Sequence, residues 1–355
     1  MILGSLRHVG VQAAIAAAVL FGAGTPMAKL LLGEVSPWLL AGLLYTGSGL
    51  GLGAYRLARR LPRVHLQPGE LLPLAGAVVF GGMLGPVLLM LGLATMPASG
   101  ASLLLNAEAV LTALIAWFVF RENVDRRIAL GMVAIVAGAV VLSVPDGSVE
   151  LGSGGLAAVG PQLAVLGACL CWGIDKNLTR KVALNDATWL AAIEGGIAGP
   201  VNLTLAFALG ATVPPVGSIA AAMGVGLLAY GVSLVLFIVA MRHVGTARAG
   251  AYFSVAPFFG AIVALFLGEA LTLPLALAAA LMAVGVWLHL TERHEHEHTH
   301  DAVTHRHAHR HDDGHHDHEH PEAVDPGTWH AHEHSHEATT HAHPHYPDAH
   351  HRHRH

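Results

Sequence analysis

The chain has 355 residues, of which 54% are hydrophobic and only 12% charged, and its mean hydropathy is +0.55. Soluble domains carry about 25% charged residues, so this composition excludes an ordinary soluble protein. The formal net charge is −5 and no basic patch with interleaved aromatic residues occurs, which argues against nucleic acid as a partner.

The charged residues are concentrated at one end of the chain. Residues 292–355 hold 13 of the 24 acidic residues, 5 of the 19 basic residues and 23 of the 27 histidines. The first 291 residues therefore read as a membrane-embedded body, and the rest as a histidine-rich tail. The N-terminal stretch MILGSLRHVG is predicted to lead into the first span, because no small-residue cleavage site follows it.

Ten apolar segments have about the 20 residues that a helix needs to cross the hydrocarbon core of a bilayer. Gly and Pro mark many of the breaks between them, as in helix-connecting loops. In lipid only helices satisfy the backbone of such segments, so the predicted fold is an all-α membrane protein. The segments are 9–32, 37–57, 70–94, 98–120, 127–145, 161–181, 187–209, 217–241, 246–267 and 273–291.

Lys and Arg in short loops predict the orientation of the spans. The loops after the second, fourth, sixth and eighth spans carry basic residues, and the alternate loops carry none. With an even number of spans, this bias predicts cytoplasmic N- and C-termini in a bacterial-type inner membrane. The basic residues are Arg56, Arg59, Arg60, Arg63, Arg121, Arg126, Arg127, Arg180, Lys181, Arg242 and Arg248.

The two halves of the body repeat one pattern. Glu122 and Gly138 are 16 residues apart, as are Glu269 and Gly285, and FGAGTPMAK at 21–29 parallels WGIDKNLTR at 172–180. Each half has five spans, an odd number, so the second half must enter the membrane inverted. Inverted repeats are typical of secondary transporters, whose binding sites lie near the midplane between the repeats.

Two motifs connect this pattern to a known family. A glycine stands seven residues before a basic residue in each half (Gly22 with Lys29, Gly173 with Arg180), and GEALTL begins at Gly268. With ten spans, these motifs resemble the drug/metabolite transporter superfamily, EamA type. The resemblance implies two inverted five-helix repeats, 9–145 and 161–291, around a central cavity, and movement of small metabolites, often by export. One departure is Val110, where the second half has Pro257.

Glu108, in the run LLLNAEAVLT, is predicted near the bilayer centre. A charge at that depth costs about 2.5 kcal/mol or more, so Glu108 should face the bundle interior or a wet cavity. Lys29 is the first basic candidate for its partner, and Lys176 is another. Glu108 could form a structural pair, or it could bind a substrate's amine or carry the coupling proton.

Further candidates for a substrate site lie inside the spans, and each has a structural alternative. Asp175 and Lys176 form either a substrate clamp or a solvated pair at the cytoplasmic end of a span. The rest either contact substrate or only pack and bond helices together: Asn106, Trp172, Glu194 and Tyr252. Glu122 and Glu269 are predicted to be helix-boundary residues. No Ser/His/Asp or HExxH constellation indicates an enzyme.

The tail 292–355 cannot build a hydrophobic core and is predicted to be disordered. Neutral imidazole binds Zn(II), Ni(II) and Cu(II), and alternating histidines on a flexible chain can reach one ion together. The predicted ligands, without selectivity, are His294, His296, His298, His300, His305, His307, His309, His311, His315, His316, His318 and His320. Cys169 and Cys171 point to different faces of one helix, so neither a disulfide nor a closed zinc site is expected.

Three functions therefore stay open. The first is a secondary transporter, on balance an exporter, of a small organic metabolite across the inner membrane, with proton coupling as an option and no required cofactor. The second is transport of a metal or of a metal-chelating metabolite, with Zn(II) or Ni(II) sensed or buffered by the tail. The third is a membrane-tethered metal sensor. The expected partners are a small-molecule substrate and the lipid bilayer, and the oligomeric state stays open, with a homodimer among the options.

Overall fold

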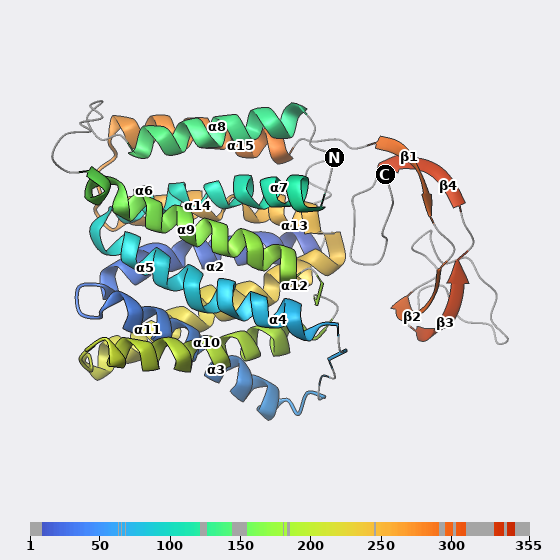
Figure 1. The fold of residues 1–355 in the computed structure, drawn as a ribbon, viewed down its shortest axis with the longest axis horizontal. Helices are drawn as coiled ribbons and strands as arrows, with labels where there is room; N and C mark the ends of the chain where they lie inside the picture. The colour runs from blue at the N-terminus through green and yellow to red at the C-terminus, as the bar shows by residue number, and fades with distance from the viewer. Residues whose placement is uncertain are drawn as a thin grey trace. The chain divides into compact units, whose positions relative to one another are not determined.

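A computed structural model describes most of the body and four short stretches of the tail. The described residues are 9–62, 64, 66–67, 69–120, 126–143, 155–179, 181–182, 185–244, 246–290, 295–300, 303–309, 330–336 and 339–344. The chain divides into two compact units, Met1–Glu292 and Arg293–His355. The first unit is a bundle of helices (Figure 1).

The helices of the first unit fall at the ten predicted positions, five in each half of the body. In the first half they are α2 (Val9–Leu31), α3 (Pro37–Ala58), α4 (Leu71–Ala77) with the π-helix η1 (Val78–Leu84) and α5 (Gly85–Thr95), α6 (Ala98–Leu104) with α7 (Ala107–Phe120), and α8 (Arg126–Ser143). In the second half they are α9 (Gly155–Thr179), α10 (Ala187–Ala208), α11 (Val216–Val225) with the π-helix η3 (Gly226–Val232) and α12 (Ser233–Val244), α13 (Thr246–Phe253) with α14 (Ala256–Phe266), and α15 (Leu273–Leu290).

The helices of the two halves make equivalent contacts, as expected for two repeats related by a two-fold axis. Helix α2 packs on α12 and α14 of the second half, and its counterpart α9 packs on α5 and α7 of the first. Likewise α3 packs on η3, and α10 packs on η1. The counterpart pairs α3–α10 and α8–α15 also contact each other, and they lie on opposite sides of the bundle (Figure 1). The core is therefore an interface between two repeats.

The irregular helix turns repeat as well. The two π-helices, 78–84 and 226–232, have the same length and are 148 residues apart. The fourth segment of each half is also interrupted, between Leu104 and Ala107 and between Phe253 and Ala256. Single π-turns inside α-helices occur frequently at functional sites, because they shift the hydrogen-bond ladder by one residue.

Local sequence explains several helix ends. Pro37 lies in the first turn of α3, where its missing N–H is not needed. The Asp186 carboxylate accepts from the Trp189 N–H at 2.9 Å and so caps α10. Gly210 and Gly268 follow the ends of α10 and α14 with φ of +88° and +100°, a conformation that favours glycine.

Helices α3 and α10 approach so closely that no side chain fits between their backbones at three points. A Cβ built on Gly49 would lie 2.3 Å from the Gly196 N, and one on Gly195 would lie 2.5 Å from the Gly49 N. A Cβ built on Gly199 would lie 2.5 Å from the Thr46 N. Small residues are typical of helix interfaces within membranes, because they let the backbones pack directly.

The outer surface of the first unit suits lipid. Large apolar side chains point outward, among them Leu72, Val216 and Phe266, which are each more than 80% exposed. By length and composition six helical segments of the described residues can cross a membrane: Val9–Leu31, Leu71–Thr95, Ala98–Ile115, Ala187–Ala208, Val216–Val244 and Ala249–Phe266. Two shorter apolar helices are Ala129–Leu142 and Leu273–Leu288. The predicted all-α body is thus confirmed, and ten crossings stay a prediction.

In the second unit the described stretches are strands, where the sequence predicted disorder. Strand β1 (Glu295–His300) pairs antiparallel with β4 (Thr339–Pro344), and β2 (Val303–His309) pairs with β3 (His330–His336). The prediction missed this pairing, because an alternating sequence without a core also has the two-residue period of a strand. An isolated two-stranded ribbon is marginally stable in water, so disorder of the tail in solution stays a prediction.

The glycine contacts between α3 and α10 give a first test. Gly49→Ala should lower the free energy of unfolding by about 1–3 kcal/mol, because the methyl group meets backbone atoms that cannot move aside. Gly53→Ala, one turn further along α3, is the control, because a Cβ there has no atom within 4 Å. Thermal unfolding of the purified proteins in detergent measures both. Equal stability of the two variants would contradict the close approach.

Candidate functional site

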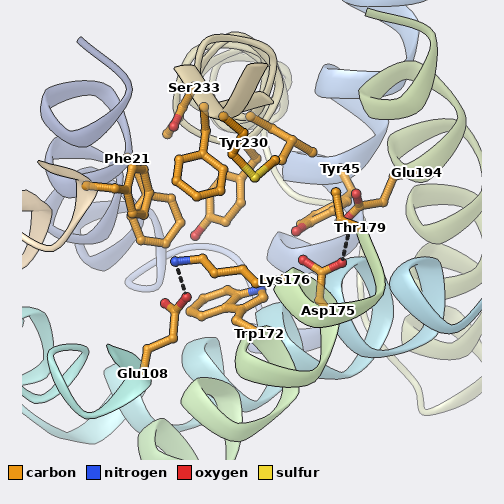
Figure 2. A pocket seen from close by; sticks show the side chains of 15 residues that line it. Phe21, Tyr45, Glu108, Trp172, Asp175, Lys176, Thr179, Glu194, Tyr230 and Ser233 are labelled. Atoms are coloured by element: carbon orange, nitrogen blue, oxygen red, sulfur yellow. Dashed lines mark hydrogen bonds and ion pairs between the residues drawn. The ribbon is translucent and has the colours of Figure 1, made fainter. Parts of the chain in front are cut away.

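A cavity of about 70 Å³ lies between the two repeats. It is lined by three acidic residues, one lysine, six aromatic residues and five others (Figure 2): Glu108, Asp175, Glu194, Lys176, Phe21, Tyr45, Trp172, Tyr230, Phe237, Phe253, Thr179, Ala229, Ser233, Leu234 and Met241. Helices of both halves contribute to the lining. The cavity therefore lies where a transporter built from inverted repeats has its substrate site.

An ion pair crosses one side of this cavity. The Glu108 carboxylate at the start of α7 contacts the Lys176 ammonium of α9 (Figure 2). The Glu108 side chain is 8% exposed and that of Lys176 is 23% exposed. The Lys176 Nζ also lies 4.6 Å from the ring centre of Phe253 and 5.1 Å from that of Phe237. One carboxylate and two aromatic faces thus hold this ammonium.

The other two acids lie at the opposite side of the cavity, together with Tyr45 (Figure 2). The Asp175 carboxylate accepts from the Thr179 hydroxyl at 2.9 Å. Asp175 and Glu194 are both buried, at 8% and 7% exposed. Asp175 is therefore not solvated as the predicted alternative required, and Lys176, 23% exposed, pairs with Glu108.

The π-helix η1 shapes this side of the cavity. Its Gly81 carbonyl accepts from the Tyr45 hydroxyl at 2.9 Å and from the Trp172 indole N–H at 3.1 Å. The Asn202 amide donates to the neighbouring Gly82 carbonyl at 3.3 Å. The π-turn thus presents backbone oxygens to side chains of α3, α9 and α10. Trp172 is fixed by this hydrogen bond and by an edge-on contact with Phe21, with ring centres 5.6 Å apart.

Lys29 is not part of the cavity, and the first predicted partner of Glu108 is wrong. The Lys29 ammonium donates to the carbonyl oxygens of Leu93 at 2.8 Å and Ala94 at 3.2 Å, in the last turn of α5. A cation there satisfies carbonyl groups that have no partner within the helix. Lys29 lies in the last turn of α2 and is not among the residues that line the cavity.

Asn106 and Tyr252 are likewise not among the lining residues. Asn106 lies in the break between α6 and α7, where its amide donates to the Leu103 carbonyl at 2.9 Å and contacts the Met282 sulfur at 3.7 Å. Asn106 thus connects the break to α6 and contacts α15. This agrees with the alternative prediction that Asn106 only bonds helices together. Tyr252 packs, partly buried, against the main apolar core.

Of the six aromatic residues that line the cavity, sequence reasoning named Trp172 and missed the other five. Tyr45 and Tyr230 carried a usable signal, because a tyrosine inside an apolar span needs a partner for its hydroxyl. Phe21, Phe237 and Phe253 carried no such signal, because a phenylalanine in an apolar span can face lipid as favourably as it faces the protein interior. Only the packing of the helices shows that these rings turn inward.

One end of the bundle is joined by Glu269, the predicted helix-boundary residue. Its carboxylate accepts from the backbone N–H groups of Ala98 at 2.7 Å and Ser99 at 2.9 Å, in the first turn of α6. Burial alone would raise the pKa of Glu269, but the hydrogen bonds from the Ser99 hydroxyl and from the two N–H groups, with the nearby Lys29 ammonium, outweigh it and lower the pKa below its ordinary value of 4.5. A loop of the second repeat thus caps a helix of the first. The counterpart Glu122 lies outside the described residues.

The opposite end of the bundle has its own ionic contact. The Arg56 guanidinium donates to the Asp186 carboxylate at 2.5 Å and to the Thr188 hydroxyl at 2.7 Å. Burial alone would raise the pKa of Asp186, but hydrogen bonds from Thr188 and Trp189 and the charge of Arg56 lower it below 3.8. This contact joins α3 to α10, so each end of the bundle is held by a contact between the two repeats.

Comparisons with known proteins agree with this architecture. A model of the EamA-like transporter family matches residues 8–144 and 161–291. An uncharacterised transporter of Methanothermobacter thermautotrophicus is 27% identical over 276 residues, which cover 74% of this chain and 80% of that protein. A solved crystal structure has a TM-score of 0.62 at 21% identity and covers 79% of this chain and 96% of the solved one. That last likeness shows the fold alone.

The fold, the cavity between two repeats and these matches define a multi-pass membrane transporter. More specifically, the chain belongs to the EamA-like transporter family, whose model covers both halves of the body.

The cap on α6 predicts a pH-dependent contribution to stability. Glu269→Gln should lower the free energy of unfolding by about 0.5–2 kcal/mol at pH 7, as loss of a helix cap does. Because folding lowers the pKa of Glu269, the charged form stabilises the fold above pH 4.5, and this contribution is lost as the pH falls through the lower, folded-state value. Thermal unfolding of both proteins between pH 3 and 7 measures the difference, and a difference that stays constant down to pH 3 would contradict a role for the charge.

Proposed function

We propose that this transporter exports a small organic metabolite that bears a protonated amine. The single observation that carries the proposal is the position of the Lys176 ammonium, between the Glu108 carboxylate and the faces of Phe237 and Phe253. Carboxylates and aromatic faces are the groups that recognise organic cations. A substrate's ammonium could take the same contacts when Lys176 moves aside.

The charges of the lining support a cationic substrate. Three carboxyl groups, Glu108, Asp175 and Glu194, face one ammonium, that of Lys176. An added cation therefore meets net attraction in a region of low dielectric constant, whereas an added anion meets net repulsion. The six aromatic residues provide the apolar contacts that a small organic molecule needs.

The position of the cavity supports export. The lining residues Thr179 and Met241 lie in the last turns of α9 and α12, towards the end that Arg56 and Asp186 join. Basic loops predict that this end is cytoplasmic, with both termini on that side of the inner membrane. A central cavity that extends towards the cytoplasmic end would load from the cell interior, and an acidic site of this kind could couple export to proton entry.

Transport of a metal ion has less support than transport of an organic amine. Among the described residues no three His, Cys, Asp or Glu side chains come together as a metal site, and aromatic rings offer a bare ion no ligand. The described structure gives metal binding by the tail no support either. Tail binding of Zn(II) or Ni(II) and the chelate alternative therefore stay predictions.

Benzylamine, an aromatic primary amine, provides a test on the purified full-length protein in detergent. It should raise the thermal unfolding temperature progressively as its concentration exceeds the Kd, because it binds the folded state. Benzoate and benzyl alcohol, of similar shape but negative or neutral, should not. Glu108→Gln should weaken benzylamine binding at least tenfold by calorimetry, equal to about 1.4 kcal/mol. Glu34→Gln, outside the cavity lining, is the matched control and should bind as the parent does.

Lys176→Met separates a cationic from an anionic substrate. Removing one partner of a buried pair costs about 3–5 kcal/mol, so this variant should be less stable than the parent. Benzylamine should bind it more tightly than it binds the parent and should recover part of the lost stability, because no internal ammonium competes. Loss of benzylamine binding by the Lys176→Met variant, or binding of benzoate to the parent, would instead indicate that Lys176 binds an anionic substrate. Either result would overturn the proposal.

The tail is tested separately from the body. A chain truncated after residue 291 should bind benzylamine as the full chain does, which would rule out a tethered sensor whose helices are only an anchor. The peptide 292–355 should bind several Zn(II) ions at pH 7.5 and release them near pH 5, since protons compete for imidazole nitrogens with an ordinary pKa of about 6.5. Calorimetric titration measures both. Lost benzylamine binding after truncation would contradict the independence of the body.

A further inference from the structure

We propose that Asp175 and Glu194 together hold one proton in the empty cavity, and that this proton leaves when a substrate cation binds. The second half of the statement rests on the proposed function, and the first half does not. The pair is distinct from Glu108, whose carboxylate already has the Lys176 ammonium as its partner.

Both acids line the same cavity and pack against consecutive glycines of η1. A Cβ built on Gly81 would lie 2.6 Å from the carboxyl carbon of Asp175, and a Cβ built on Gly82 would lie 3.1 Å from the Cγ methylene of Glu194. A side chain at either glycine would therefore collide with one of the two acids. They come from different helices, α9 and α10, and Figure 2 shows them on the same side of the cavity.

The surroundings offer the pair little compensation for two negative charges. The Thr179 hydroxyl donates to Asp175 at 2.9 Å, but the Tyr45 hydroxyl and the Trp172 indole N–H both donate to the Gly81 carbonyl instead. Among the described residues no Lys or Arg forms an ion pair with Asp175 or Glu194.

The remaining titratable groups around the pair are few. They are Tyr45 on α3, Tyr230 on η3, Glu108 on α7 and Lys176 on α9. The tyrosines are neutral near pH 7 by their ordinary chemistry, and Lys176 and Glu108 neutralise each other. Two ionised carboxylates would thus leave two uncompensated charges in a buried site.

Buried like charges avoid this cost by sharing a proton, as paired carboxylates do in general. A metal cation would need a shell of several ligands, and among the described residues no three His, Cys, Asp or Glu side chains come together to provide one. A bound proton needs no such shell. The geometry therefore favours a proton over a metal cation as the resident charge.

The pair is also placed to couple binding to movement. Asp175 and Glu194 belong to the second repeat, whereas the glycines and Tyr45 against which they pack belong to the first. Alternating access moves one repeat relative to the other around the central site. An ammonium entering the cavity would replace the proton as the compensating charge, so the two carboxyl groups and their bound cation keep one net negative charge with either cation bound.

Infrared spectroscopy of the full-length protein in detergent tests the proton directly, without any substrate. The parent should show the carbonyl band of a protonated carboxyl group at pH 6 that disappears as the pH is raised to 10. The double variant Asp175→Asn, Glu194→Gln should lack this band, and Glu34→Gln, outside the cavity lining, should keep it. Circular dichroism and gel filtration confirm that each variant is folded. A band that persists in the double variant, or that is lost with Glu34→Gln, would overturn the proposal.

Calorimetry of benzylamine in buffers of different ionisation enthalpy tests the exchange. The parent should release about one proton per benzylamine bound at pH 6, and the double variant should release none while still binding at Glu108. Equal release by both proteins would overturn the exchange. If benzylamine does not bind the parent, the proposed amine substrate fails, and the infrared band alone then decides whether the pair holds a proton.

Discussion

The ion pair between Glu108 and Lys176 is the interaction around which the centre of the body is organised. A charged group at mid-membrane depth is tolerated only where it faces a partner or a wet cavity. Here the pair joins α7 of the first repeat to α9 of the second, and the rings of Phe237 and Phe253 close over the ammonium. The site and the interface between the repeats are therefore one structure.

The two π-turns give this interface its shape. Their common length and spacing of 148 residues show that both repeats keep the same irregular turn. In η1 the turn brings Gly81 and Gly82 against Asp175 and Glu194 and presents a carbonyl to Tyr45 and Trp172. A regular helix with larger side chains would fill the space that the carboxyl groups occupy.

At both ends of the bundle, as at its centre, a charged side chain joins the two repeats. Glu269 caps α6 across the repeats at one end, and Arg56 contacts Asp186 across them at the other. Each contact is a charge-assisted hydrogen bond, stronger than a neutral one yet exchangeable with water near the membrane surface. Contacts of this kind can hold one arrangement of the repeats and release it during a transport cycle.

The sequence by itself determined the helical body, the positions of the helical segments and the repeat, because these depend on apolar length and on the order of motifs along the chain. It also indicated that Glu108, Asp175, Lys176 and Glu194 matter, since charge inside an apolar segment is costly wherever it points. It could not decide partners. Lys29 and Lys176 are both basic residues near helix ends, and only the packing of α9 against α7 brings Lys176 to Glu108 while Lys29 caps α5. The inward turn of the phenylalanines and the placement of two acids on adjacent glycines were decided by tertiary structure alone, because contacts between residues far apart in the chain leave no local pattern.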